Sequence, residues 1–119
     1  MKILYANKKI ERYCTSIKEA SKLFGGDKKL ALSLLSRINA FEQAEVINDI
    51  CIIKPFRFHK LSGNYNGYFA VDVRNIRDKW RIILQPLDDN EKAFKPCHID
   101  EIAHMVRIVE IVEVSAHYE

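Results

Sequence analysis

The chain has 119 residues and a net charge of +3, from 19 lysine and arginine residues against 16 aspartate and glutamate residues. Hydrophobic residues make up 48% and charged residues 29% of it, which excludes a disordered chain and predicts one folded domain over residues 1–119. No apolar run approaches about 18 residues, so neither a membrane span nor a membrane partner is expected. The apolar stretch after Met1 is too short for a signal peptide, which favours the cytoplasm.

The charge is distributed unevenly along the chain. Residues 1–60 hold 12 basic and 6 acidic side chains, a balance of +6, whereas residues 61–119 hold 7 and 10, a balance of −3. A basic first half favours a polyanionic partner such as RNA, whose phosphates attract lysine and arginine. The same lysines also suit the solvated faces of ordinary helices.

The first part of the sequence predicts a short strand and two helices. Residues 3–5 read as a strand, and apolar residues recur at helical spacing over residues 7–24. The glycine pair at residues 25–26 ends this helix, because glycine readily takes the left-handed conformation. Asp27 then suits the N-cap of a second helix. The apolar side of that helix comprises Leu30, Leu34, Ile38 and Phe41. We expect two antiparallel helices joined by a glycine turn.

The middle of the sequence has the texture of a small sheet. After residues 44–53, which fit either a short helix or extended chain, aromatic and β-branched residues predominate. The strand-like segments are residues 56–63, 67–73 and 79–84. Turn-rich sequences at residues 62–67 and 75–78 separate them, and the first of these ends in an Asn-Gly pair. This pattern predicts an antiparallel meander.

The last part of the sequence predicts one more strand. Pro86 is expected to end the strand before it, because proline cannot donate a ladder hydrogen bond. Residues 87–105 form a longer polar connection with room for a helical turn. Residues 106–114 are apolar on both faces, as in a central strand. Helices followed by a meander define an α+β fold in which the helices cover one sheet face.

The cysteines and histidines do not predict a metal site. Cys14, Cys51 and Cys97 are widely spaced, without a Cys-x-x-Cys pair, and are expected to be free thiols. Cys97-His98 with Asp100 and His104 resembles half a zinc site, but a second pair at the usual spacing is missing. We therefore expect no metal and no cofactor.

Four short motifs follow one another along the chain: His59-x-Leu61-x-Gly63, Gly67-Tyr68, Trp80-Arg81-Ile82 and the terminal His117-Tyr118. In this order they resemble the RelE/ParE toxin superfamily and, within it, the HigB-like plasmid maintenance killer branch. The resemblance implies a RelE-like fold, an N-terminal helical hairpin packed on a small twisted antiparallel sheet. It also implies a type II toxin that inhibits translation as a ribosome-dependent mRNA endonuclease. The implied partners are a HigA-like helix-turn-helix antitoxin, the ribosome with its mRNA, and operator DNA through the antitoxin complex alone.

Metal-free RNA cleavage needs a proton acceptor, a proton donor and fixed cations. The resemblance assigns catalysis to His117, just beyond the last strand, and transition-state stabilisation to Arg81. Strand alternation places Arg81 among aliphatic neighbours, where a guanidinium needs either an anionic ligand or an acidic partner on a neighbouring strand. The family's Asp-Tyr pair before the terminal histidine is replaced by Ser115-Ala116. Tyr118 is the candidate to supply the phenol.

A second group of candidates lies in the segment before Gly63. The family has a lysine directly before this glycine, where the present sequence has Ser62, so Lys60 is predicted to substitute as a catalytic residue. Arg57 is a candidate phosphate ligand or a solvated charge. His59 matches a histidine of the motif and either contacts substrate or makes a structural hydrogen bond.

Lysines on the predicted helices form the last candidate surface. Lys8 and Lys9 are its substrate-binding candidates, either facing ribosomal RNA or simply solvating the helix. Two other functions fit the same sequence. One is a scaffold with eroded chemistry that binds an antitoxin or RNA, and the other is a ParE-like gyrase inhibitor, which would need neither His117 nor Arg81.

Overall fold

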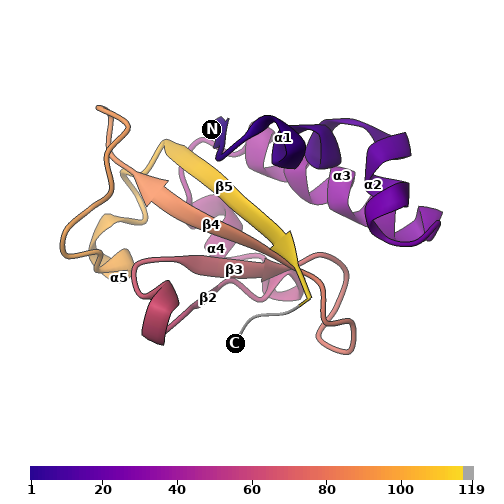
Figure 1. The fold of residues 1–119 in the computed structure, drawn as a ribbon. Helices are drawn as coiled ribbons and strands as arrows, with labels where there is room; N and C mark the ends of the chain where they lie inside the picture. Colours follow the sequence, from indigo (N-terminus) through magenta and orange to yellow (C-terminus); the bar gives the residue numbers. More distant parts are fainter. Residues whose placement is uncertain (117–119) are drawn as a thin grey trace.

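The computed structural model of the protein describes residues 1–116. Its centre is a five-stranded sheet in the order β1-β5-β4-β3-β2, of which Figure 1 labels β5, β4, β3 and β2. The strands are β1 (Lys2–Tyr5), β2 (His59–Lys60), β3 (Phe69–Asp72), β4 (Arg81–Leu87) and β5 (Ile108–Ser115). β5 lies between β1 and β4, so the prediction of a central final strand is confirmed.

The edge of the sheet at β1 differs from the prediction. β1 pairs with β5 in parallel, whereas the β5–β4, β4–β3 and β3–β2 pairs are antiparallel. The expectation of a wholly antiparallel sheet is therefore wrong. Parallel strands need a long crossover, and here nearly the whole chain runs between the two.

The helical region contains three helices instead of two. They are α1 (Lys8–Thr15), α2 (Ile17–Leu23) and α3 (Lys28–Gln43). Ser16 has extended backbone angles (φ −131°, ψ 120°), so it ends α1, and its hydroxyl accepts a hydrogen bond from Glu19 N at 3.3 Å to begin α2. The single helix predicted over residues 7–24 is thus wrong. The glycine turn and the Asp27 cap are as predicted, with Leu30 N donating to Asp27 Oδ1 at 3.0 Å.

Short helical turns replace much of the extended chain expected between α3 and β3. α4 (Asn48–Cys51) and the 3₁₀ helix η1 (Lys54–Phe56) precede β2, and η2 (Gly63–Tyr65) lies in the β2–β3 hairpin loop. The strand predicted over residues 56–63 is therefore reduced to two residues. Proline fixes its own φ and opens helical turns easily, which explains why Pro55 lies inside η1.

β4 continues through Pro86, contrary to prediction. Pro86 pairs with Val109 of β5, while β3 pairs with β4 no farther than Leu84. At Pro86 the strand is therefore bordered on one side only, where the missing N–H is tolerated. The connection that follows contains α5 (Ile99–Ile102), so the predicted helical turn is confirmed.

The two faces of the sheet have different surroundings. Residues of α1, α3 and α4 share the main hydrophobic core with Phe69, Val71, Ile82 and Leu84 of the sheet. The opposite face, called the outer face below, carries a small cluster of Leu61, Ala70 and Ile83 flanked by Tyr65, Tyr68 and Val112. None of the helices within residues 1–116 is long and apolar enough to cross a membrane.

Candidate functional site

Asp72, at the end of β3, is the centre of a buried ionic cluster. Its side chain is 1% exposed. Its Oδ1 lies 3.0 Å from Arg81 Nε, and its Oδ2 lies 3.0 Å from Arg57 Nε. Asp72 and Arg81 are the buried charged residues of the described chain. Because an unpaired buried charge is costly, each depends on the other for its place in the fold.

Arg81 also binds the loop that joins β3 to β4. Its Nη1 donates to the carbonyl oxygens of Asp78 and of Trp80, the latter at 2.9 Å, and its Nη2 donates to Ile76 O at 3.3 Å. Asp72 is its register partner across the β3–β4 ladder. The structure therefore contains the alternative foreseen for Arg81, an acidic partner on a neighbouring strand.

Arg57 approaches the same carboxylate from outside. Its backbone is left-handed (φ 50°, ψ 52°), which costs a residue other than glycine about 1–2 kcal/mol. Its side chain is 37% exposed. Within residues 1–116 its hydrogen bonds run from Nε to Asp72, and no partner is recorded for Nη1 or Nη2. This guanidinium is therefore both anchored and accessible.

His59 is held by the backbone of Arg57. Its Nδ1 lies 2.6 Å from Arg57 O. A carbonyl oxygen can only accept a hydrogen bond, so Nδ1 carries a proton, and in the neutral ring Nε2 is the acceptor. The hydrogen-bonding role foreseen for His59 is thus present. Its Nε2 has no hydrogen-bond partner within residues 1–116.

The sheet register separates Lys60 from these groups. His59 pairs with Ala70 of the outer face, whereas Lys60 pairs with Phe69 of the main core. Alternation along β3 and β4 puts Asp72 on the face of Ala70 and Arg81 on the face of Ile83. The structure therefore brings Arg57, His59 and Arg81 together on the outer face, and it does not bring Lys60 to them.

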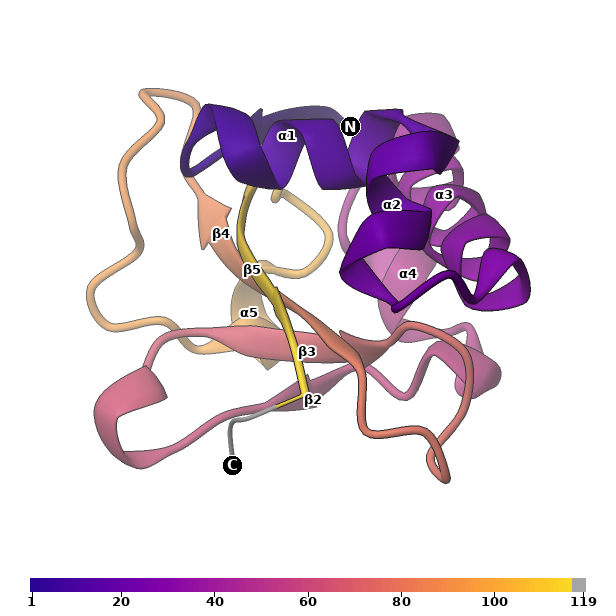
Figure 2. The same ribbon diagram turned by 45° about the vertical axis from the view of Figure 1, so that its right-hand side comes forward.

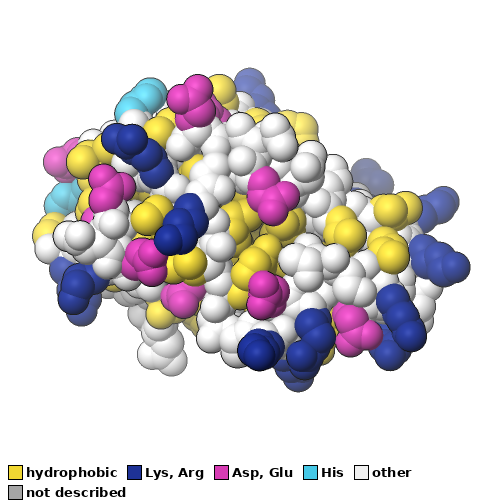
Figure 3. Space-filling model, turned by 90° about the horizontal axis from the view of Figure 1, so that it is seen from above, with side chains coloured by type: hydrophobic (Ala, Val, Ile, Leu, Met, Phe, Trp, Pro, Cys, Tyr) yellow, Lys and Arg dark blue, Asp and Glu magenta, His cyan; other side chains and the backbone are white. Residues whose placement is uncertain are grey.

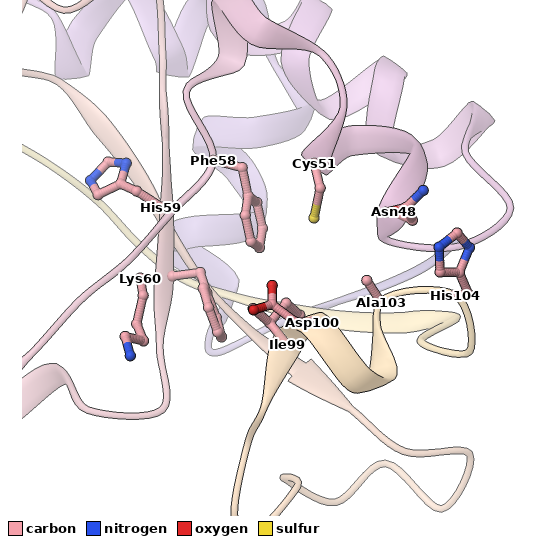
Figure 4. Close-up of a pocket in the computed structure, with 10 residues that line it drawn as sticks. Asn48, Cys51, Phe58, His59, Lys60, Ile99, Asp100, Ala103 and His104 are labelled. Atoms are coloured by element: carbon pink, nitrogen blue, oxygen red, sulfur yellow. The ribbon is translucent and has the colours of Figure 1, made fainter.

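Lys60 instead borders a cavity of about 320 Å³ between β2, α4 and α5 (Figure 4). Figure 4 shows the His59 ring directed away from this cavity, while Phe58, Cys51 and Asp100 surround it. Burial, followed by the negative charge of Asp100, raises the pKa of the Cys51 thiol to about 11. In residues 1–116 no group of three or more histidine, cysteine, aspartate or glutamate side chains could hold a metal ion.

Two predicted residues, His117 and Tyr118, lie outside the described part of the chain. The register does show what precedes them, because Ser115 of β5 pairs with Arg81 of β4. Figure 1 likewise shows β5 ending beside the turn from β3 to β4. The last described strand residue is thus adjacent to the ionic cluster.

Lys8 and Lys9 lie elsewhere. They begin α1, which is at the opposite end of the molecule from β2 and the end of β5 (Figure 2). Lys9 Nζ is 5.9 Å from the centre of the Tyr13 ring. Seen from above, many lysine and arginine side chains gather toward the part of the helical layer formed by α2 and the start of α3 (Figure 3). Lys8 and Lys9 thus belong to a basic surface separate from that of Arg57 and Arg81.

Sequence reasoning missed Asp72. The signal was a carboxylate within the otherwise apolar run of residues 69–73, in a strand predicted to pair with that of Arg81. A buried acid in such a strand needs a cation, and the neighbouring strand supplies one.

Comparison with known proteins gives a likeness of fold. No protein-family model matches the sequence, and no curated protein matches it significantly. Among solved structures, a chain of the YoeB–YefM complex from Staphylococcus aureus superposes with a TM-score of 0.53 at 14% sequence identity. The match covers 99% of this chain and 98% of that chain. The two chains therefore share their overall α+β fold.

Proposed function

We propose that the protein is the toxin of a type II toxin–antitoxin system and that it inhibits translation by cutting mRNA on the ribosome. The supporting observation is the joint presence of Arg57, His59, Asp72 and Arg81 on one sheet face beside the end of β5. The fold shared with a chain of a toxin–antitoxin complex supports the same function.

The proposed chemistry needs no metal ion. A base removes the proton of a ribose 2′-hydroxyl, whose oxygen attacks the adjacent phosphorus. The bond from phosphorus to the 5′-oxygen breaks as an acid protonates that oxygen, leaving a 2′,3′-cyclic phosphate and a 5′-hydroxyl. A guanidinium offsets the negative charge that develops on the phosphoryl oxygens.

His117 is the proposed imidazole for these proton transfers, with Tyr118 beside it. The support for this proposal is that Ser115, which pairs with Arg81, precedes His117 by two residues in the sequence. His59 is proposed to contact the RNA through Nε2. Lys8 and Lys9 are proposed to face the ribosome.

The proposed protein partner is a HigA-like helix-turn-helix antitoxin, through which the complex would bind operator DNA. The similar fold comes from a complex of two proteins, which supports an antitoxin partner in general terms. The cytoplasm is the proposed site of action, because ribosomes and mRNA meet there.

The test combines induced expression with a reconstituted translation reaction in which new mRNA 5′ ends are mapped. Wild-type protein should arrest growth and cut mRNA. His117→Gln should slow cleavage by about 10²–10⁴-fold, because it removes a proton-transfer group. His98→Gln is the matched control, since His98 is an exposed histidine paired with Glu101 and should leave cleavage intact.

A second candidate is a binding module that uses the same fold without cleavage. It is favoured by Arg81, whose guanidinium is occupied within the protein, and by Ser62 in place of the family's lysine. Absence of both growth arrest and new mRNA ends would favour this module. Growth arrest that tracks DNA damage and persists in His117→Gln would instead indicate a gyrase inhibitor.

A further inference from the structure

The two arginines that share Asp72 differ in how many donors they have left. A guanidinium has five N–H groups. Arg81 donates three of them to the carbonyl oxygens of residues 76, 78 and 80, and its Nε lies 3.0 Å from Asp72 Oδ1 in an ion pair. Its side chain is 10% exposed. Arg81 could make a forked contact with a phosphate only after releasing carbonyl oxygens of the β3–β4 loop.

Arg57, by contrast, keeps most of its hydrogen-bond donors available. Its Nε is shared by both oxygens of Asp72, at 3.0 and 3.2 Å. The four N–H groups on Nη1 and Nη2 have no recorded partner in residues 1–116. The carboxylate thus fixes the guanidinium at one edge and leaves the Nη1–Nη2 edge available for a forked contact with a phosphate.

The backbone at Arg57 supports a functional role for this side chain. Its left-handed conformation favours glycine, yet the sequence has arginine there. Backbone conformations of this kind are concentrated at ligand-binding and catalytic positions. The same conformation turns the chain from η1 into β2, the strand that carries His59 on the outer face. His59 Nδ1 in turn donates a hydrogen bond to the carbonyl oxygen of Arg57.

We infer that Arg57, oriented by the Asp72 carboxylate, is the guanidinium that contacts the scissile phosphate of the RNA. Arg81 instead holds the β3–β4 loop and adds positive charge behind the site. Two guanidiniums against one carboxylate leave a net charge of about +1 facing the ligand. This inference rests on the proposed function for the identity of the substrate. The phosphate contact is thereby assigned to Arg57 instead of Arg81, the residue that the sequence resemblance suggested.

The test compares two arginines of similar exposure. Arg57→Gln should lower kcat for mRNA cleavage by about 10²–10³-fold, as expected when a transition-state donor is lost. Arg57→Lys should recover only part of this loss. Lysine keeps the positive charge, but its ammonium cannot contact Asp72 and a phosphate with separate edges as a guanidinium does. Arg74→Gln is the control, because Arg74 is 39% exposed and pairs with Asp78 at 2.6 Å. It should change kcat less than about twofold, on the scale of a surface substitution.

Binding of a short single-stranded RNA at several salt concentrations separates this inference from the proposed function. Loss of one phosphate contact should reduce the slope of log K against log salt by about 0.7 in Arg57→Gln, with no change in Arg74→Gln. If wild-type protein cuts no mRNA but the slope of log K against log salt is still smaller for Arg57→Gln than for wild type, the proposed function fails and the phosphate contact stands. If folded Arg57→Gln matches wild type in both cleavage and slope, the inference is wrong.

Discussion

At the scale of single residues, burial controls the chemistry of the thiols. Cys14 on α1 is 2% exposed, and burial raises its pKa to about 12. The pKa of Cys51 is raised to about 11, chiefly by burial. Both thiols therefore stay protonated near neutral pH and act as small apolar groups instead of nucleophiles.

The raised pKa of Cys14 predicts a loss of stability in alkali. Below about pH 9 the thiol is protonated in both the folded and the unfolded chain, so its contribution is fully present. Between about pH 9 and 12 the unfolded chain releases the proton while the folded chain keeps it, so the free energy of unfolding falls with rising pH. The slope from this group approaches about 1.4 kcal/mol per pH unit. Urea unfolding of Cys14→Ala should show a shallower decline above pH 9, and parallel wild-type and mutant profiles would contradict this.

At the scale of elements, caps decide where the helices begin. Asp27 accepts the N–H of Leu30 at the start of α3. Ser16 has extended backbone angles between α1 and α2 and caps the second of them. Serine and aspartate favour such positions because their side-chain oxygens replace a missing backbone acceptor.

The α3 cap predicts a measurable stability effect. Asp27→Ala should lower the free energy of unfolding by about 1 kcal/mol, because Leu30 N loses its acceptor. Asp89→Ala removes the same charge from an exposed loop position and is the matched control. Urea denaturation of both variants measures the difference. Equal destabilisation by the two substitutions would show that the cap contributes nothing beyond charge.

At the scale of the whole molecule, two basic regions occupy different ends. Arg57 and Arg81 lie beside the end of β5, whereas Lys8 and Lys9 begin α1 on the far side (Figure 2). The proposed cleavage of mRNA on a ribosome requires contact with both the message and ribosomal RNA. The two regions therefore suit separate contacts with the two RNAs.

This separation predicts a distinct phenotype for the helical lysines. The double variant Lys8→Gln/Lys9→Gln should weaken ribosome association and reduce the slope of log K against log salt by about 1 to 2, because two phosphate contacts are lost. The control Lys92→Gln/Lys95→Gln removes the same charge from the connection between β4 and α5. Sedimentation with ribosomes measures both. Equal weakening by the two double variants would show that net charge, and not the α1 surface, drives association.

Local patterns in the sequence were enough to predict several features of the fold. Asp27 and the glycine pair mark the start of α3, because caps and left-handed turns depend on neighbouring residues alone. The apolar run in β5 predicts a strand with neighbours on both sides, and the structure confirms it. Alternation along β4 correctly divides Ile82 and Leu84 from Ile83.

Features that depend on distant residues were not predictable in this way. The parallel pairing of β1 with β5 joins the two ends of the described chain, and the tolerance of Pro86 depends on where β3 stops pairing.

The sequence by itself thus determined the α+β class, the capped start of α3, the hairpin loop and the presence of arginine and histidine around β2 and β4. Only the tertiary structure decided that Asp72 joins Arg57 to Arg81, and that Lys60 faces the core side. The physical reason is that capping and periodicity act over a few residues. Register and burial instead arise from segments that meet only when the whole sheet has formed.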